Sequence, residues 1–128
     1  MSDRAALEAL VDRFTAAFNR DDLDTVMELM ADDAIYDEFN GVRSVGREAI
    51  RKAFEPQFAG AFGTIRFHNE DVFIDAEQGK VLTRWVCSLE REGRRREWRG
   101  LDILRVQDGR ITEKHTYAKT QRLDLREP

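Results

Sequence analysis

The sequence predicts an α+β domain, with helices in the first half of the chain and strands in the second half. Apolar residues recur at helical spacing up to residue 58 and alternate with polar residues from residue 64 onwards. The pair Asp108-Gly109, which is typical of a two-residue hairpin turn, separates the last two alternating segments. Helices and strands segregated in this way favour helices packed against one sheet over an alternating α/β fold.

Two helices are expected at the start of the chain. Ser2 or Asp3 can cap the first helix, which ends within residues 19–22. Asp21 or Asp22 can accept the free N–H groups of the second helix, which follows at once. Each helix has one apolar face, and these faces consist, in chain order, of Leu7, Leu10, Val11, Phe14 and Phe18 and of Leu23, Val26, Met27 and Met30.

A short extended segment, a turn and a third helix complete the first half. Residues 34–39 are expected to be extended, and Asn40-Gly41 is expected to turn the chain. The third helix is expected over residues 47–58, with Pro56 distorting its last turn. Its apolar face consists of Ile50, Ala53, Phe54 and Phe58.

Four long strands are expected in the second half, joined by short turns into an antiparallel meander. Inside the first strand the apolar residues change phase, which predicts a β-bulge near Asn69-Glu70. Long antiparallel strands twist and curl, so we expect a curved sheet with the helices on its concave side and a pocket between the two layers. The expected strands are residues 64–75, 80–91, 95–106 and 110–120.

The composition is that of one soluble domain. The 128 residues are 41% hydrophobic and 36% charged, and we expect residues 1–128 to form one domain with a frayed tail over residues 121–128. The net charge of -4 argues against a nucleic-acid partner, and no apolar run approaches the roughly 20 residues of a membrane span. A polar N-terminus and a single cysteine, Cys87, lead us to expect a cytoplasmic protein.

No metal or cofactor site is expected. The two histidines, His68 and His115, and Cys87 lie far apart and lack the spacing of metal ligands. The chain has neither a glycine-rich phosphate loop nor a serine nucleophile motif. Cys87 is expected to be a small buried residue rather than a nucleophile.

Six short segments, spread over nearly the whole chain, carry a family resemblance. They are VDRF at residues 11–14, NRDDL at 19–23, MADDA at 30–34, GREAIR at 46–51, RGLDILRV at 99–106 and DGRI at 108–111. Together they resemble the ketosteroid isomerase and SnoaL-like branch of the nuclear transport factor 2-like (NTF2-like) superfamily. The resemblance implies a cone-shaped α+β fold in which three N-terminal helices pack on the concave face of a curved antiparallel sheet.

The resemblance also implies roles for individual residues. Glu38 matches the carboxylate base of the isomerase pattern, and Asp102 matches the protonated aspartic acid that donates to the substrate oxyanion. Phe14 and Phe54 stand where that pattern has hydrogen-bonding tyrosines. Because deleting one oxyanion donor typically costs about 3–4 kcal/mol, steroid isomerase activity is not expected.

The residues themselves also single out Glu38 and Asp102 as an acid–base pair. Asp102 lies in an apolar run, where burial favours the neutral form, whereas Glu38 at the pocket mouth would stay ionised. Two alternatives are open. Asp102 could be paired with Arg84 or Arg99, or capped by the backbone. Asp37 could replace Glu38, because a shift of one residue along a strand reverses which side chain points inward.

His68 is a further catalytic candidate, because an imidazole titrates near neutral pH and can act as a general base. Tyr36 could complete a dehydratase-like set with His68 and an aspartate, and the alternative is a surface histidine. His115 is expected to face a partner rather than the pocket. The expected pocket walls imply an apolar or aromatic ligand, and they are Phe14, Phe18, Tyr36, Phe54, Phe58, Trp85 and Trp98.

We therefore expect a cofactor-independent enzyme, of isomerase, cyclase, dehydratase or hydrolase type, that acts on a small hydrophobic molecule. The alternative is a non-catalytic module that binds a small ligand or pairs with a second copy. A homodimer is expected through the outer face of the sheet, where an apolar patch could form from Val86, Leu101, Ile103 and Tyr117.

Overall fold

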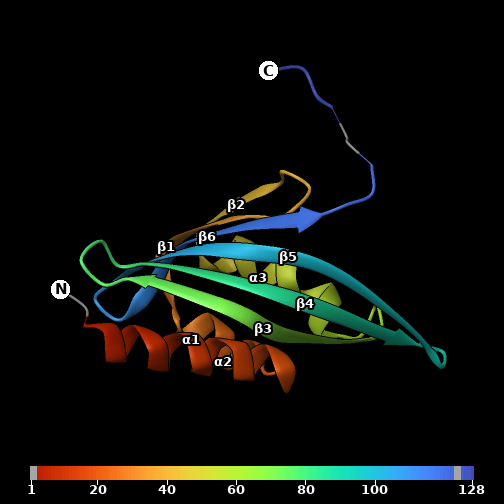
Figure 1. Cartoon of the computed structure of the whole chain (residues 1–128), viewed down its shortest axis with the longest axis horizontal. Coiled ribbons are helices and arrows are strands. Elements are labelled where there is room, and N and C mark those ends of the chain that lie inside the picture. The colour runs from red at the N-terminus through yellow and green to blue at the C-terminus, as the bar shows by residue number, and fades with distance from the viewer. Residues whose placement is uncertain (1–2, 123–124) are drawn as a thin grey trace.

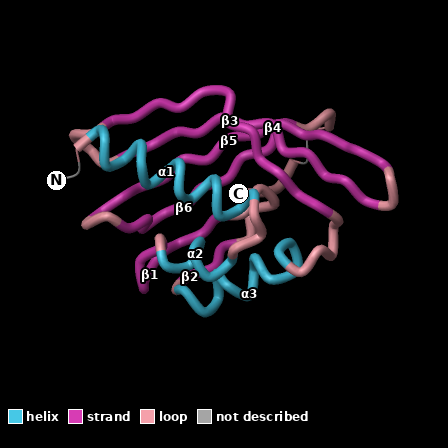
Figure 2. Tube along the Cα trace, turned by 90° about the horizontal axis from the view of Figure 1, so that it is seen from below, coloured by secondary structure: helices cyan, strands magenta, loops and turns pink. Residues whose placement is uncertain are grey.

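The computed structural model describes residues 3–122 and 125–128 of the chain. Within them, one curved sheet is covered on one side by the helices, and Figure 2 views the molecule from that side (Figure 1, Figure 2). The helices are α1 (Arg4–Asn19), α2 (Leu23–Glu28) and α3 (Arg47–Phe58). The strands are β1 (Met30–Asp37), β2 (Arg43–Val45), β3 (Thr64–Asp75), β4 (Lys80–Arg91), β5 (Arg94–Gln107) and β6 (Arg110–Lys119). Their order across the sheet is β2-β1-β6-β5-β4-β3.

The first two helices begin where aspartate side chains satisfy their free N–H groups. The Asp3 carboxylate accepts a hydrogen bond from the Ala6 N–H at 2.7 Å, and Asp22 accepts one from the Thr25 N–H at 3.1 Å. These bonds confirm Asp3 and Asp22 as caps, whereas Ser2 lies outside the described residues. α1 buries its predicted apolar face, namely Leu7, Leu10, Val11, Phe14 and Phe18.

β1 starts earlier than the predicted extended segment. Met30, expected at the end of the second helix, is the first residue of β1, and α2 ends at Glu28. The Ile111 N–H donates to the Leu29 carbonyl at 2.8 Å, so the chain already belongs to the sheet at this point. Pairing of Met30 with Ile111 of β6 thus starts the strand ahead of an acidic segment that shows no strand period of its own, and the pairing resumes at Ile35.

The sheet is mixed rather than purely antiparallel, which corrects the prediction. β1 runs parallel to β6, with Tyr36 in register with Lys114 and Asp37 in register with His115. The other neighbouring strands are antiparallel. β2 was not predicted, because three residues are too few to show an alternating pattern.

The long strands of the second half confirm the predicted meander. β3 and β4 span the predicted residues, and β5 and β6 differ from the prediction only at their ends. The register between β3 and β4 shifts between Asn69 and Asp71, which confirms the expected bulge. The inward side chains of the sheet and the apolar faces of the helices form one core, which includes Leu7, Phe54 and Leu104.

The chain ends beyond β6 in a segment without regular structure. The predicted frayed tail includes residues 123–124, which lie outside the described residues. Residues 121–122 and 125–128 form neither helix nor strand. Among the described residues, none of the helices has the length and the hydropathy needed to span a bilayer.

A second, smaller core surrounds Trp85, which is 2% exposed. Gly100 of β5 is in register with Trp85 of β4. A Cβ atom added at Gly100 would lie 2.5 Å from the indole ring and 2.4 Å from the Tyr117 carbonyl oxygen. The absence of a side chain at Gly100 therefore makes space for the indole ring of Trp85. The indole in turn contacts the rings of Phe67 and Trp98 at centroid distances of 5.1 and 5.5 Å.

We expect Gly100→Ala to lower the free energy of unfolding by about 1–3 kcal/mol, because the added methyl group overpacks this core. Urea denaturation followed by circular dichroism measures the change. In a Trp85→Phe background the same substitution should cost less, since the smaller ring frees part of the space. An equal cost in both backgrounds would show that the indole is not what requires glycine here.

Candidate functional site

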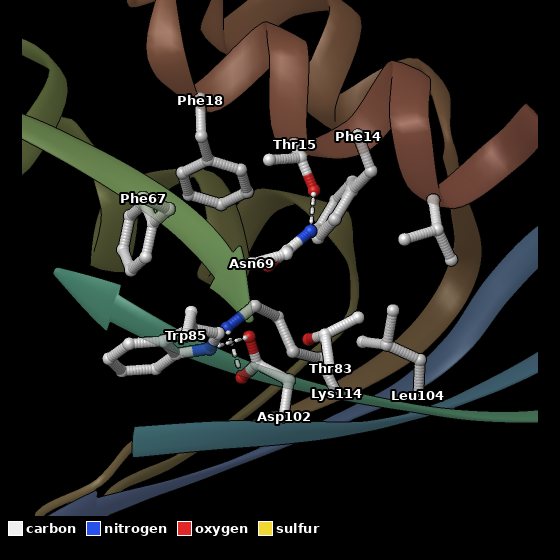
Figure 3. Close-up of a pocket in the computed structure, with 11 residues that line it drawn as sticks. Phe14, Thr15, Phe18, Phe67, Asn69, Thr83, Trp85, Asp102, Leu104 and Lys114 are labelled. Carbon is white, nitrogen blue, oxygen red and sulfur yellow. Dashed lines mark hydrogen bonds and ion pairs between the residues drawn. The ribbon is translucent and has the colours of Figure 1, made fainter. Parts of the chain in front are cut away.

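A small cavity lies between α1 and the inner face of the sheet (Figure 3). Its volume is about 30 Å³, which is room for about one or two water molecules. Aromatic rings form much of its wall, and polar groups lie on the sheet side and next to α1. The lining residues are Val11, Phe14, Thr15, Phe18, Phe67, Asn69, Thr83, Trp85, Asp102, Leu104 and Lys114.

Asp102 of β5 and Lys114 of β6 form a buried ion pair on the sheet side of the cavity. Lys114 Nζ lies 2.9 Å from Asp102 Oδ1, and only 7% of the lysine and 11% of the aspartate side chain is exposed. Lys114 also donates to Thr116 Oγ1 at 2.8 Å, and the Thr116 hydroxyl donates to the same Asp102 oxygen. Trp85 Nε1 donates to the other carboxylate oxygen at 3.0 Å. These four residues, here called the ion-pair cluster, join β4, β5 and β6.

The contacts of Asp102 are those of an ionised carboxylate. An ammonium and an indole N–H can only donate, so both carboxylate oxygens act as acceptors. The one described neighbour that could accept a proton from the predicted neutral acid is the Thr116 hydroxyl, and here it donates to Asp102, so these contacts favour the carboxylate form. The alternative arginine partners are wrong. Arg84 pairs with Asp71, and Arg99 pairs with Glu70, on the outer face of the sheet.

The Lys114 ammonium is held by charge and by aromatic rings. Burial alone lowers the pKa of Lys114, but the negative charge and the hydrogen bond of Asp102 outweigh it and leave the pKa raised. Nζ lies 4.7 Å from the centre of the Tyr36 ring, within the range of a cation–π interaction. Two of the three N–H groups donate to Asp102 and Thr116, which leaves one for a ligand among the residues described.

A bulge in β6 decides that Lys114 faces the cavity. The register between β5 and β6 shifts by one residue where Thr112 has no partner. Asp102 therefore lies opposite Thr116, whereas the unshifted register of the hairpin would place it opposite His115. Lys114 and Thr116 were missed in the sequence for this reason, since β6 has too few apolar residues to reveal the change of phase.

At the end of β1, the two alternative candidates for the pocket carboxylate, Asp37 and Glu38, point in different directions. Asp37 turns away from the cavity, where Arg43 donates to its oxygens at 2.6 and 2.9 Å and His115 Nδ1 lies 2.7 Å away. The hydrogen bond from Arg43, aided by His115, lowers the pKa of Asp37.

Glu38, the next residue, does not line the cavity but is half-buried and close enough to Lys114 for their charges to interact. Burial raises the pKa of Glu38, and the Lys114 ammonium offsets only part of that rise. Of the two carboxylates, Glu38 is thus the one without an arginine partner among the described residues.

The predicted aromatic walls divide into two groups. Those that line the cavity are Phe14, Phe18 and Trp85. Those that pack against these rings, outside the cavity, are Phe54, Phe58 and Trp98, and Tyr36 stacks on Phe54 behind them. Four further residues line the cavity that were not predicted to do so, namely Phe67, Thr15, Asn69 and Thr83. A phenylalanine next to a candidate histidine and three small polar residues carry no distinctive signal in the sequence.

His68 lies apart from the cavity. It is exposed on β3, in register with Val86, on the face of the sheet opposite to Asp102. The structure therefore does not bring His68 together with Glu38 or Asp102. Cys87 is 1% exposed, and burial raises the pKa of its thiol to about 11, which confirms a buried residue of low reactivity. Within residues 3–122 and 125–128, no three His, Cys, Asp or Glu side chains gather in a way that could hold a metal ion.

We expect Lys114→Met to lower the free energy of unfolding by about 3–5 kcal/mol, because it leaves Asp102 as a buried charge without its partner. Urea denaturation at neutral pH measures the loss. The double variant Asp102→Leu/Lys114→Met should recover most of it, since no buried charge remains. Arg84→Met, which breaks the exposed pair with Asp71, is the control and should cost less than about 1 kcal/mol. Similar losses for Lys114→Met and Arg84→Met would contradict the account of the ion-pair cluster.

The chain is similar to known proteins in sequence and in fold. Residues 11–114 match the family model of the SnoaL-like domain. A candidate polyketide cyclase from Xanthomonas campestris pv. campestris shares 25% identity, with 91% of this chain and 92% of that chain covered and a TM-score of 0.75. A nuclear transport factor 2-like protein of unknown function from Mesorhizobium loti shares 26% identity, with 94% of this chain and 97% of that chain covered and a TM-score of 0.77.

A protein from a soil-derived mobile gene cassette has the same fold, with a TM-score of 0.76 at 24% identity and 89% of each chain covered. No curated protein matches the sequence. Because the family model spans well over half of the 128 residues, and the fold agrees with it, this chain belongs to the SnoaL-like family of the nuclear transport factor 2-like superfamily.

Proposed function

We propose that the chain is a cofactor-independent enzyme that moves a proton next to a carbonyl group of a small hydrophobic molecule. The observation that carries this proposal is the buried Lys114 ammonium, which has one N–H left for a ligand beside an aromatic cavity. Membership of the SnoaL-like family and the similarity to a candidate polyketide cyclase support a substrate that contains a ketone.

In the proposed reaction the carbonyl oxygen of the substrate accepts a hydrogen bond from Lys114. Glu38 removes a proton from the adjacent carbon, and the electron pair of the broken C–H bond forms an enolate whose oxygen is negative. The ammonium stabilises this charge more strongly than it stabilises the neutral ketone. Return of the proton from Glu38 to another carbon completes an isomerisation. Attack of the enolate carbon on a second carbonyl group, with Glu38 protonating the new alkoxide, completes a cyclisation.

Asp102 acts in this proposal as a positioning residue rather than as the acid. Its carboxylate orients the ammonium and raises the pKa of Lys114, so that the lysine donates a hydrogen bond and does not take the proton. A cation at this position also supplies what Phe14 and Phe54 cannot, because neither ring has a hydroxyl group to donate to an oxyanion.

A substrate needs more space than the described cavity of about 30 Å³ provides. Binding therefore requires the aromatic wall to rearrange. The segment after β1 is our candidate entrance, since it follows Glu38 directly. There the ring of Phe39 is 54% exposed and contacts Trp98 at a centroid distance of 5.0 Å, so it can swing away without breaking a hydrogen bond.

The proposal predicts catalysed exchange of the protons next to a ketone. With 2-tetralone, a bicyclic aromatic ketone, in D2O, we expect the protein to speed the loss of the α-proton signal in NMR spectra above the buffer rate. Glu38→Gln removes the base and Lys114→Met removes the oxyanion donor, so each should lower the rate by about 100-fold or more. Asp37→Asn neutralises the neighbouring carboxylate outside the cavity and should retain the rate. If folded Glu38→Gln exchanged the α-protons at the wild-type rate, Glu38 would not be the base.

The exchange rate should also depend on pH through Glu38. This group acts as a base only when it is ionised, and burial raises its pKa above the usual value of 4.5. The rate should therefore fall as the pH decreases through that raised pKa. Asp37→Asn should show the same fall. Rates measured from about pH 4 to about pH 8 give the profile, and a profile that is flat on the acid side would point to a different base.

A second candidate function is a non-catalytic module that binds a small ligand or pairs with a second copy. The small cavity favours it, and so does the outer face of the sheet, where 36% of Ile103 and 57% of Tyr117 is exposed beside Leu101 and Val86. Binding of 2-tetralone without exchange, unchanged in Glu38→Gln, would select this function. Sedimentation velocity would detect the homodimer but would not by itself separate the two candidates.

A further inference from the structure

We infer that Asn69 and Thr15 form a second polar subsite of the cavity, which binds a second oxygen atom of the ligand. The inference deepens the proposed function and rests on it for the use of this cavity as a ligand site. Its consequence is a substrate class, namely flat aromatic molecules that carry a hydroxyl group in addition to the ketone.

The alternation of β3 points Asn69 into the cavity, on the same face as Ile65 and Phe67, and a bulge follows directly after it. Asn69 is in register with Trp85, which also lines the cavity, and the register shifts at the next residue, Glu70. Glu70 turns outward and accepts a hydrogen bond from Arg99 at 2.6 Å. The bulge therefore places the next carboxylate, that of Asp71, on the outer face as well, where it pairs with Arg84. The uncharged amide of Asn69 is left as the polar group inside. Bulges often re-aim side chains in this way next to active sites.

Asn69 meets a hydroxyl group of the opposite layer. Its Nδ2 donates to Thr15 Oγ1 of α1 at 3.0 Å, and both residues are half-buried and line the cavity (Figure 3). Thr15 follows Phe14, so its hydroxyl lies at the edge of the aromatic wall. The pair thus places polar atoms next to α1, whereas the ion-pair cluster places its polar atoms on the sheet.

A second asparagine shows how a purely structural bridge between α1 and β3 is built. Asn19 donates to the Phe67 carbonyl at 2.8 Å and accepts from the Phe67 N–H at 2.7 Å, so both ends of its amide are used. Within the described part of the chain, the side chain of Asn69 makes one hydrogen bond, the one to Thr15. Its oxygen and one N–H are left over, as is the hydroxyl proton of Thr15.

The groups left over in this pair suit a hydroxyl group. A hydroxyl can donate to the Asn69 oxygen and accept from the Asn69 N–H or the Thr15 O–H, so one group satisfies both sides. A carboxylate or a phosphate fits poorly, because the pair carries no charge. With the carbonyl at Lys114, the rings of Phe14 and Trp85 favour a flat aromatic body between the two polar ends.

Two ligands that differ by one hydroxyl group test the inference. They are 2-tetralone and 6-hydroxy-2-tetralone, whose hydroxyl lies on the ring remote from the ketone. Dissociation constants are measured by NMR titration of isotope-labelled protein. We expect the wild-type protein to bind the hydroxylated ligand about tenfold more tightly. Asn69→Leu and Thr15→Val should each reduce the ratio of the two dissociation constants to about twofold or less, because only the hydroxylated ligand loses a hydrogen bond.

Two further variants control for loss of structure. His68→Ala, on the outer face of the same strand, should keep the whole preference. Asn19→Ala should lower stability and still keep it, because that amide bonds only to backbone.

Equal binding of both ligands by the wild type, binding of neither, or an equal loss for both in Asn69→Leu would overturn the inference. A retained preference in a protein that catalyses no exchange would reject the proposed enzyme and leave the subsite standing.

Discussion

The buried ion pair between Asp102 and Lys114 is the interaction on which the cavity depends. Removing a carboxylate and an ammonium from water costs several kcal/mol for each charge, and their attraction offsets this cost only when further hydrogen bonds complete the pair. Trp85 and Thr116 supply these bonds. Because the four side chains come from β4, β5 and β6, the pair holds three strands in one geometry and with them the polar side of the cavity.

Two bulges determine which side chains reach this cavity. The extra residue Thr112 in β6 turns Lys114 inward, and the extra residue Glu70 in β3 places Asp71 on the outer face beside Arg84, so that Asn69 is the last inward polar group before the bulge. Side chains alternate with a period of two along a strand, so one extra residue reverses the face of every residue that follows it. The two strands agree in their result: each presents a hydrogen-bond donor to the cavity and keeps its carboxylates on the outer face.

The cavity combines polar groups that are held by hydrogen bonds with a wall of aromatic rings that make none. Hydrogen bonds hold the ion-pair cluster, whereas the rings of Phe14, Phe18 and Phe67 meet edge to face at centroid distances of 5.0 and 5.6 Å without such bonds. The ion pair is buried, and this burial keeps out bulk water, which would weaken the attraction between the two charges. A ligand that displaces the rings would meet donors that are already oriented, and oriented donors are what stabilise a developing negative charge most effectively.

The sequence by itself determined the three helices, the four long strands, the bulge near Asn69 and the inward position of Asp102, and it narrowed each of the first two helix caps to two residues. Each of these depends on residues a few positions apart, so a local pattern encodes it. Only the tertiary structure decided the partner of Asp102 and the parallel pairing of β1 with β6. These contacts join segments far apart in the chain, and an unseen bulge sets their register, so no period counted along one strand could place Lys114 in the cavity.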